Sequence, residues 1–280
     1  MGENEAVVRT GHLFRPLHAA LMDVLRRLGP DDWARATGAG DWTVRDAAAH
    51  LLDGDVRRIS AERDGHVAPP DHAIAGYDDL LLHLNEMNAQ WTRAARRMSS
   101  RLLVDLLEYT GPVLATLMEG APLESDATFP VAWAGQQRSP MWLDMGRELT
   151  ERWHHQDQIR EAVGAEPVAA PELLGAVIAV SLFALPAALD RVARPDGTRV
   201  AITARGPAGG TWHVERRAGV WRQVEADTAA SPAARIMAAD LDVARLLLHR
   251  LSAAQTAERI QLDGDLELAA ALIEARAVMV

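Results

Sequence analysis

The sequence predicts a four-helix bundle over residues 1–168, followed by a small α+β domain over residues 169–280. Up to about residue 165, apolar residues recur with the period of a helix and show no convincing strand alternation. From residue 199 onward, three short segments have the composition of strands, and two of them flank a turn signal. The change of pattern places the domain boundary near residue 168.

The helices of the first half have recognisable starts and stops. Thr43 and Asp46 form a capping-box pattern before an apolar stretch, and Gly29-Pro30 and Gly164 end helices. The expected helices are Glu5–Leu28, Val44–Asp64, Tyr77–Met98, Arg101–Met118 and Pro140–Val163. Long helices with one irregular crossover, at 120–140, indicate a four-helix bundle.

The second half mixes helices and strands. A buried helix is expected at Pro171–Val192, and two further helices at Pro232–Leu251 and Leu266–Val278. Strands are expected at Arg199–Ala204, Thr211–Arg216 and Val220–Glu225. The last two strands alternate and flank Arg217-Ala218-Gly219, which is a hairpin signal.

Composition excludes several classes of protein. The formal net charge of −10 argues against a basic face for nucleic acid. The chain has no cysteine, so it has no disulfide and no thiolate of its own. We expect a cytoplasmic protein without a membrane span, because the N-terminus lacks a signal-peptide pattern and Gly175, Ser181 and Pro186 interrupt the longest apolar stretch.

One helix carries a pair of side chains that suit a metal ion. Glu151 and His155 lie four residues apart, so both project from the same helix face. His154 is an alternative ligand, three residues from Glu151. Taken alone, such a pair is more often a surface contact than a metal site. His50, on the capped second helix, is the best third ligand, and a His₂Glu set with an open position is typical of catalytic zinc.

Other polar and aromatic residues have two interpretations each. Arg147, Arg160 and Asn88 could help to bind a substrate or a thiol, but ordinary helix-surface roles are the favoured explanation for each of them. Asp46 and Asp53 could orient the ring of His50. Four tryptophans near these segments could line a pocket or pack in the core: Trp42, Trp133, Trp142 and Trp153.

Two segments resemble a known family. DWTVRDAAAHLLDGD, which contains His50, resembles the second helix of the DinB-like, mycothiol-dependent maleylpyruvate isomerases. The stretch from Val131 to Gly164, with ERWHHQDQIR, is also similar to that family. The C-terminal GVWRQVEAD and GDLELAAALIEARAVMV resemble its smaller, sterol-carrier-like domain.

The resemblance implies a metal site formed by His50, Glu151 and His155. It also implies an enzyme that uses an exogenous thiol, commonly mycothiol, for isomerisation or thiol transfer on a small electrophilic substrate that bears a carboxylate. Zn²⁺ is the expected ion, although a His₂Glu set also accepts Ni²⁺, Co²⁺ or Fe²⁺.

Several alternatives stay open. One is a thiol-independent lyase, hydrolase or cyclase on the same scaffold, and another is a non-enzymatic metal-binding or ligand-binding protein. The expected partners are a small-molecule substrate and a thiol, with no nucleic acid and no membrane. The sequence allows either a monomer or a homodimer.

Overall fold

The computed structural model describes residues 7–134, 138–225 and 231–277. Contacts along the chain divide it into two compact units. One unit consists of Arg9–Phe129 and Pro140–Val168, and the other contains the described residues of Met1–Val8, Pro130–Ser139 and Ala169–Met279. Whether residues 1–168 and 169–280 are independent domains stays a prediction.

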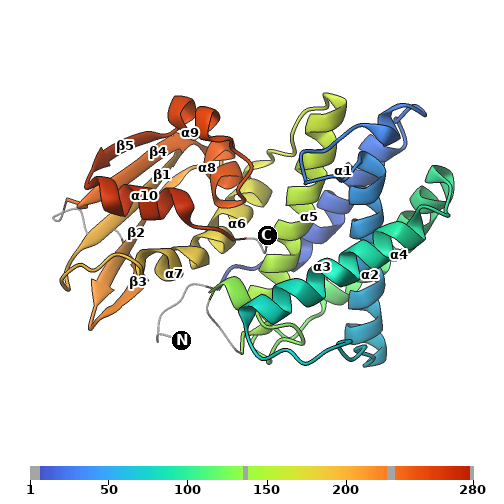
Figure 1. The fold of residues 1–280 in the computed structure, drawn as a ribbon, viewed down its shortest axis with the longest axis horizontal. Helices are drawn as coiled ribbons and strands as arrows, with labels where there is room; N and C mark the ends of the chain where they lie inside the picture. Colours follow the sequence, from blue (N-terminus) through green and yellow to red (C-terminus); the bar gives the residue numbers. More distant parts are fainter. Residues whose placement is uncertain (1–6, 135–137, 226–230, 278–280) are drawn as a thin grey trace. The chain divides into compact units, whose positions relative to one another are not determined.

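Four helices of the first unit form the predicted bundle. They are α1 (Phe14–Leu25), α2 (Val44–Asp64), α4 (Ser100–Glu119) and α5 (Met141–Val163). Helices α1 and α2 each pack against both α4 and α5, whereas α3 (Tyr77–Ala95) lies against α2 outside this set (Figure 1). The bundle core is apolar, with Leu21 and Leu25 of α1 and Leu103 and Leu107 of α4 all nearly inaccessible to solvent.

The helix ends follow from local chemistry. The capping box at the start of α2 is formed as predicted, since the Thr43 side chain accepts from the Asp46 backbone and the Asp46 side chain accepts from the Thr43 backbone. Gly164 has a φ of 71° and ends α5, also as predicted. The first helix is shorter than expected, because Gly11–Leu13 forms a 3₁₀ turn (η1) ahead of α1. The predicted start at Glu5 lies outside the described residues.

The second unit is built on a mixed five-stranded sheet with the order β3-β2-β1-β4-β5. The strands are β1 (Arg199–Arg205), β2 (Gly210–Arg217), β3 (Val220–Val224), β4 (Ala234–Ala239) and β5 (Gln261–Gly264). Strands β1 and β4 are parallel, and the other pairs are antiparallel. Ala218 and Gly219 have φ values of 50° and 80°, which give the predicted hairpin the tight turn that suits twisted strands.

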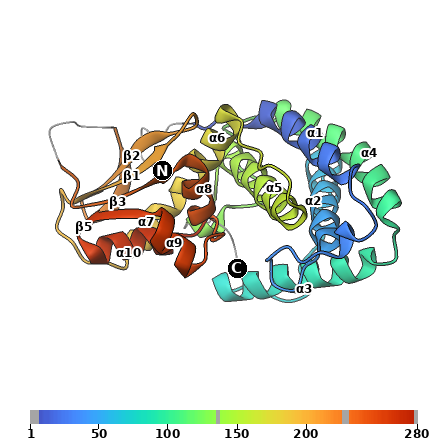
Figure 2. The same ribbon diagram turned by 90° about the horizontal axis from the view of Figure 1, so that it is seen from above.

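Helices cover one face of this sheet. Helix α7 (Leu185–Leu189) packs on β3, α10 (Leu266–Glu274) packs on β4, and α8 (Asp240–Leu247) packs on β1 and β4 (Figure 2). Short helices α6 (Pro171–Ser181) and α9 (Ala253–Arg259) and the 3₁₀ turns η2 (Asp32–Ala34), η3 (Ala132–Ala134) and η4 (Leu182–Ala184) complete the described elements. The predicted fold class, a helical bundle followed by an α+β unit, is confirmed.

The predicted helix at Pro232–Leu251 is wrong in its first part. Ala234–Ala239 forms β4, and only Asp240–Leu247 is helical. Ala234, Ile236 and Ala238 are buried in alternation, and β4 pairs with β1, which is more than 30 residues away in the chain. An alanine-rich segment fits either a helix or a strand locally, so the partner strand decides. Helix α9 and strand β5 were not predicted from the sequence.

The sequence predicts one buried helix over Pro171–Val192, and in the structure its apolar part, Pro171–Leu189, is divided. It consists of α6, the 3₁₀ turn η4 and α7, with Pro186 in the first turn of α7. Among the described residues, this is the only stretch long and apolar enough to cross a membrane, and 67% of its most apolar window is buried inside the protein. Such burial is typical of a core helix, as predicted. The cytoplasmic location stays a prediction.

Gly264 provides a test of the sheet. Its φ is 86°, and an added Cβ would lie 2.1 Å from the carbonyl oxygen of Ala233. We expect Gly264→Ala to lower the free energy of unfolding by about 2–4 kcal/mol, from left-handed backbone strain plus overpacking. Chemical denaturation of the full chain measures this change.

Gly197 is the matched control for Gly264. It has nearly the same φ, 87°, but no atom within 4 Å of an added Cβ. Gly197→Ala should therefore cost only the backbone strain, about 1 kcal/mol. Equal destabilisation by the two substitutions would contradict the close approach of β5 to Ala233.

Candidate metal site

Three side chains from two bundle helices converge at one point. His50 comes from α2, and Glu151 and His155 come from α5. Glu151 Oε1 lies 3.2 Å from His50 Nε2 and 3.1 Å from His155 Nε2. The ligand atoms of all three residues lie within 4.8 Å of one another. The structure thus brings together the three residues that the sequence predicts.

The donor set fits a divalent ion. Ligand atoms about 2.0–2.1 Å from a tetrahedral zinc lie about 3.3 Å apart, close to the observed separations between Glu151 and the two imidazoles. The Glu151 side chain is 33% exposed, whereas those of His50 and His155 are 8% and 9% exposed. The cluster therefore lies at the edge of the core, with the carboxylate on its more exposed side.

The charge states of the cluster favour a cation. Burial by itself would raise the pKa of Glu151, but the neighbouring His155 and His50 outweigh burial and hold that pKa well below its ordinary value. Burial lowers the pKa of His50 against the opposing effect of Glu151. An ionised carboxylate and a neutral imidazole are the forms that bind metal ions.

Trp42 packs against both histidines of the cluster. Its ring centroid lies 4.9 Å from that of His50 and 5.5 Å from that of His155. By contrast, Trp142 and Trp153 are core residues, and Trp153 donates a hydrogen bond to the carbonyl of Val168. The side chain of Trp133 lies outside the described residues. Of the three tryptophans whose side chains are described, Trp42 is the one with ring contacts to the cluster.

The two adjacent histidines have different surroundings. His155 belongs to the cluster, and its Nδ1 lies 2.8 Å from Gln158 Oε1. His154 is not part of that group, and its Nε2 lies 3.0 Å from Gln158 Nε2. Gln158 was not among the residues predicted from the sequence. Its spacing of three residues from His155 on one helix is the pattern that indicates a contact between the two side chains.

Arg147 takes part in an ionic network between α2 and α5. It donates to Asp144 over 2.8 Å, and Arg58 contacts the same carboxylate through two hydrogen bonds of 2.6 Å. Arg58 also donates to Glu148 over 3.2 Å. The guanidinium of Arg147 is hydrogen-bonded to Asp144, and Asp144 in turn binds Arg58 of α2. Arg147 therefore belongs to the ionic contact between α2 and α5. The sequence did not predict this network, because the network joins residues about 90 positions apart in the chain.

Arg160 and Asn88, the other predicted helpers, lie in different places. Arg160 donates to the carbonyls of Ala20 and Glu166, so it links the end of α5 to α1. The Oδ1 atom of Asn88 is buried on α3 without a hydrogen-bond partner among the described residues. Neither residue belongs to the group of potential metal ligands, and their roles in binding stay predictions.

Asp46 and Asp53, the two predicted partners of the His50 ring, make different contacts in the structure. Asp46 is engaged by the helix cap and by Arg96, so it does not orient the imidazole. Asp53 is buried, and Arg57 lies 3.0 Å from it. Burial raises the pKa of Asp53. The Nδ1 atom of His50 is itself buried and has no hydrogen-bond partner among the described residues.

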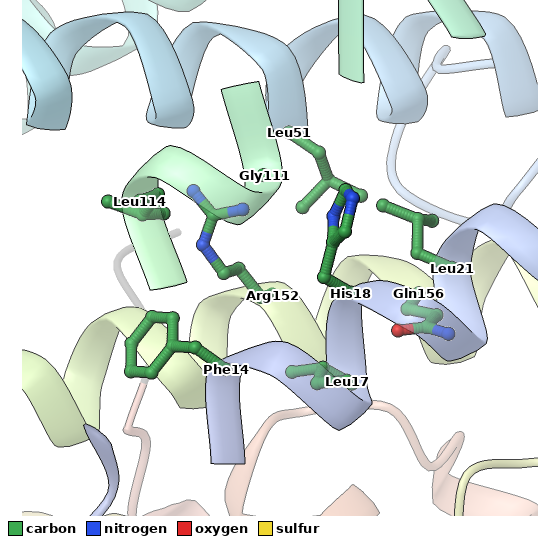
Figure 3. Close-up of a pocket in the computed structure, with 9 residues that line it drawn as sticks. All are labelled: Phe14, Leu17, His18, Leu21, Leu51, Gly111, Leu114, Arg152 and Gln156. Carbon is green, nitrogen blue, oxygen red and sulfur yellow. The ribbon is translucent and has the colours of Figure 1, made fainter. Parts of the chain in front are cut away.

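A separate small cavity lies between α1, α4 and α5. His18, Arg152 and Gln156 contribute its polar groups, and Gly111 admits the His18 ring, since an added Cβ would lie 2.0 Å from it (Figure 3). Its volume of about 10 Å³ is roughly that of one water molecule. None of His50, Glu151 and His155 lines it, so it does not serve as a substrate pocket for the metal cluster.

Comparison with known proteins identifies the family of the chain. Residues 14–160 match the family described as "Mycothiol maleylpyruvate isomerase N-terminal domain", which is more than half of the chain. The chain belongs to this family. The family match contains all three residues of the cluster, and the resemblance seen in the sequence is confirmed.

Solved structures extend the likeness of this family member beyond its bundle. The crystal structure of the mycothiol-dependent maleylpyruvate isomerase is 12% identical, with a TM-score of 0.55 over 92% of this chain and 93% of that chain. A histidine-to-alanine mutant of that enzyme gives 12% identity and a TM-score of 0.54 over the same shares. At this identity the likeness establishes the fold of both units. No curated protein matches the chain.

The buried network makes stability dependent on pH. Burial alone would raise the pKa of Glu148, but Arg58, Arg152 and Arg147 lower it from 4.5 to about 2 in the folded protein. This carboxylate therefore stabilises the fold above about pH 4.5, and the stabilisation, on the order of 3 kcal/mol, is lost as the pH falls toward 2. We expect Glu148→Gln to be less stable at neutral pH and to lose less stability between about pH 5 and pH 3.

Urea unfolding at several pH values measures this difference. Glu124→Gln, at an exposed carboxylate, is the control and should follow the wild-type profile. Parallel profiles for wild type and Glu148→Gln would show that the network does not hold this carboxylate ionised.

Proposed function

We propose that this protein is a metal-dependent enzyme that uses an external low-molecular-weight thiol, mycothiol or a close relative. Its reaction is an isomerisation or a thiol transfer on a small electrophilic substrate that carries a carboxylate. The observation that supports this proposal most directly is the convergence of His50, Glu151 and His155 within 4.8 Å. Membership of the mycothiol maleylpyruvate isomerase family supports the choice of thiol and of reaction class.

The ligand set favours catalysis over a purely structural role. Structural zinc sites are closed by four protein ligands, whereas catalytic sites keep a position for water or substrate. The cluster offers three ligands, and Glu151 is the most exposed of them. We infer that His50, Glu151 and His155 hold the ion and leave its exposed side for the thiol.

The chemistry of the thiol follows from the same arrangement. With a divalent ion held by His50, Glu151 and His155, a thiol bound beside these residues would have a lowered pKa and would be available as a thiolate at neutral pH. The chain has no cysteine, and the thiol must therefore be external. Trp42, packed on both imidazoles, keeps their rings in place and excludes water from that side of the cluster.

Elemental analysis tests the metal site. Protein purified without chelator, or reconstituted with zinc and desalted, should contain about one divalent ion per chain. His50→Ala and His155→Ala should each lose it, because each removes one of only three ligands. His154→Ala is the matched control and should retain the ion. Wild-type protein without metal after reconstitution, or loss of metal in His154→Ala alone, would overturn this ligand set.

Turnover assays test the need for a thiol. Maleylpyruvate is the first substrate to examine, because it is the substrate named for the similar solved enzyme. We expect isomerisation with mycothiol and none without added thiol, and no turnover in the metal-free His155→Ala variant. Equal turnover with and without thiol would contradict the thiol requirement and would favour the metal-assisted lyase, hydrolase or cyclase instead.

A further inference from the structure

We infer that Arg57 of α2, held by the buried carboxylate of Asp53, binds a carboxylate of the substrate beside the metal cluster. The inference rests on the proposed function, because it assigns a residue to the carboxylate-bearing substrate of that site. It starts from a partly exposed guanidinium near His50 that takes no part in the ionic network between α2 and α5. The Nε atom of Arg57 lies 3.0 Å from Asp53 Oδ2.

The helix places Arg57 on the same side as His50. Residues seven apart on an α-helix lie on one face, two turns from each other. Helical side chains lean toward the N-terminus of their helix, and the guanidinium of Arg57 accordingly reaches back to Asp53, four residues earlier. Asp53 is only three residues from His50, which makes the two side chains neighbours on the helix surface. The guanidinium therefore lies about one helical turn from the imidazole.

The electrostatics of α2 agree with this position. Burial is the largest influence on the pKa of His50, and the charge of Arg57 is among the smaller influences that lower it. Burial raises the pKa of Asp53, while Arg57 and His50 both oppose that effect. The three side chains thus lie close together along one face of α2.

The other arginines of α2 and α5 are committed to contacts within the protein. Three belong to the buried network, and at most 19% of each side chain is exposed: Arg58, Arg147 and Arg152. Three more contact backbone carbonyls or a neighbouring carboxylate: Arg45, Arg63 and Arg160. The side chain of Arg57, by contrast, is 35% exposed, and Asp53 is its one acidic partner among the described residues.

The chemistry of this guanidinium suits a carboxylate. It presents five N–H donors in a planar fork, and the contact with Asp53 is made through Nε. That Nε atom is inaccessible to solvent, so Asp53 holds the guanidinium from its buried side. The two terminal nitrogens remain for a second carboxylate, which an arginine can bind through two parallel hydrogen bonds. The carbon chain of a small acid bound there would lie within reach of the cluster.

The balance of charge around Arg57 favours an anion once the cluster holds an ion. In the protein alone, Asp53 offsets the charge of Arg57, and Glu151 adds a negative charge nearby. With a divalent cation bound by the cluster, the same group of side chains and ion carries a net positive charge, which attracts an anionic ligand.

Calorimetric titration with maleate tests this role in the zinc-reconstituted full chain. Maleate, added without thiol, is the dicarboxylic acid part of the compound named for the similar solved enzyme. Arg57→Gln should weaken its binding by about 10- to 100-fold, as expected for the loss of a charge-assisted contact. Arg57→Lys keeps the charge beside Asp53 but not the planar fork, and its affinity should lie between the two. Arg57→Gln with wild-type affinity, or a wild type that does not bind maleate, would overturn the inference.

Arg63→Gln is the matched control. Arg63 also lies on α2 and also pairs with a nearby carboxylate, that of Asp64, but it belongs to the last turn of the helix. Its substitution should change the affinity for maleate by less than about twofold. An equal loss of affinity in Arg63→Gln would assign the effect to the overall charge of the surface and contradict a specific site at Arg57.

A second ligand separates binding by Arg57 from loss of stability. Maleamate carries an amide in place of one carboxylate of maleate. The wild type should bind maleate about 10- to 100-fold more tightly than maleamate, whereas Arg57→Gln should bind the two about equally. Because both ligands are compared on the same folded variant, this preference does not depend on the stability of that variant. The same preference for maleate in both proteins would contradict the role of Arg57.

Failure of the proposed function would look different from failure of this inference. Wild-type protein that converts no maleylpyruvate in the presence of mycothiol counts against the proposed function. The maleate affinities of the wild type and of Arg57→Gln still decide whether Arg57 binds a carboxylate.

Discussion

Charged side chains buried between α2 and α5 hold together the two helices that carry His50, Glu151 and His155. Arg58 of α2 binds Asp144 of α5 through two hydrogen bonds of 2.6 Å, and Arg152 of α5 returns to Asp55 of α2 over 2.6 Å. Removing one partner of a buried pair typically costs about 3–5 kcal/mol, so the helices cannot slide past one another without a large penalty. The two helices run antiparallel at these contacts. His50, one to two turns before Asp55 and Arg58 on α2, therefore lies beside Glu151 and His155 of α5.

This arrangement also explains the electrostatics of the site. Arginines surround Glu148 and Asp144 and keep them ionised within the core, so these carboxylates act in the helix contact. Glu151, one turn further along α5, is paired with two imidazoles and is partly exposed. The carboxylates of α5 thus differ in their contacts with α2. Asp144 and Glu148 bind Arg58, whereas Glu151 contacts His50. Among these three carboxylates of α5, Glu151 is the one whose contacts are with imidazoles and not with arginines, so its negative charge is available to a cation.

Helical geometry decides which of the two neighbouring histidines, His154 or His155, lies in the cluster. Adjacent residues on an α-helix point about 100° apart, so His154 and His155 cannot both face α2. Orientation brings His155 to the cluster and leaves His154 outside it. The buried amide of Gln158 lies within hydrogen-bond distance of both rings. Trp42 adds a rigid wall from the loop before α2.

The sequence by itself determined the features that depend on neighbours within about one helical turn. It predicted the helix cap at Thr43 and Asp46, the stop at Gly164, the hairpin at Ala218-Gly219 and the i,i+4 pair of Glu151 and His155. It also predicted His50, on a separate capped helix, as the third ligand, and the resemblance to a family supported that choice. Tertiary structure decided that Ala234–Ala239 is a strand, that Asp144 engages Arg58 and Arg147, and that Trp42 covers both imidazoles. These outcomes depend on partners distant in the chain, and local periodicity contains no information about which distant partner will pack there.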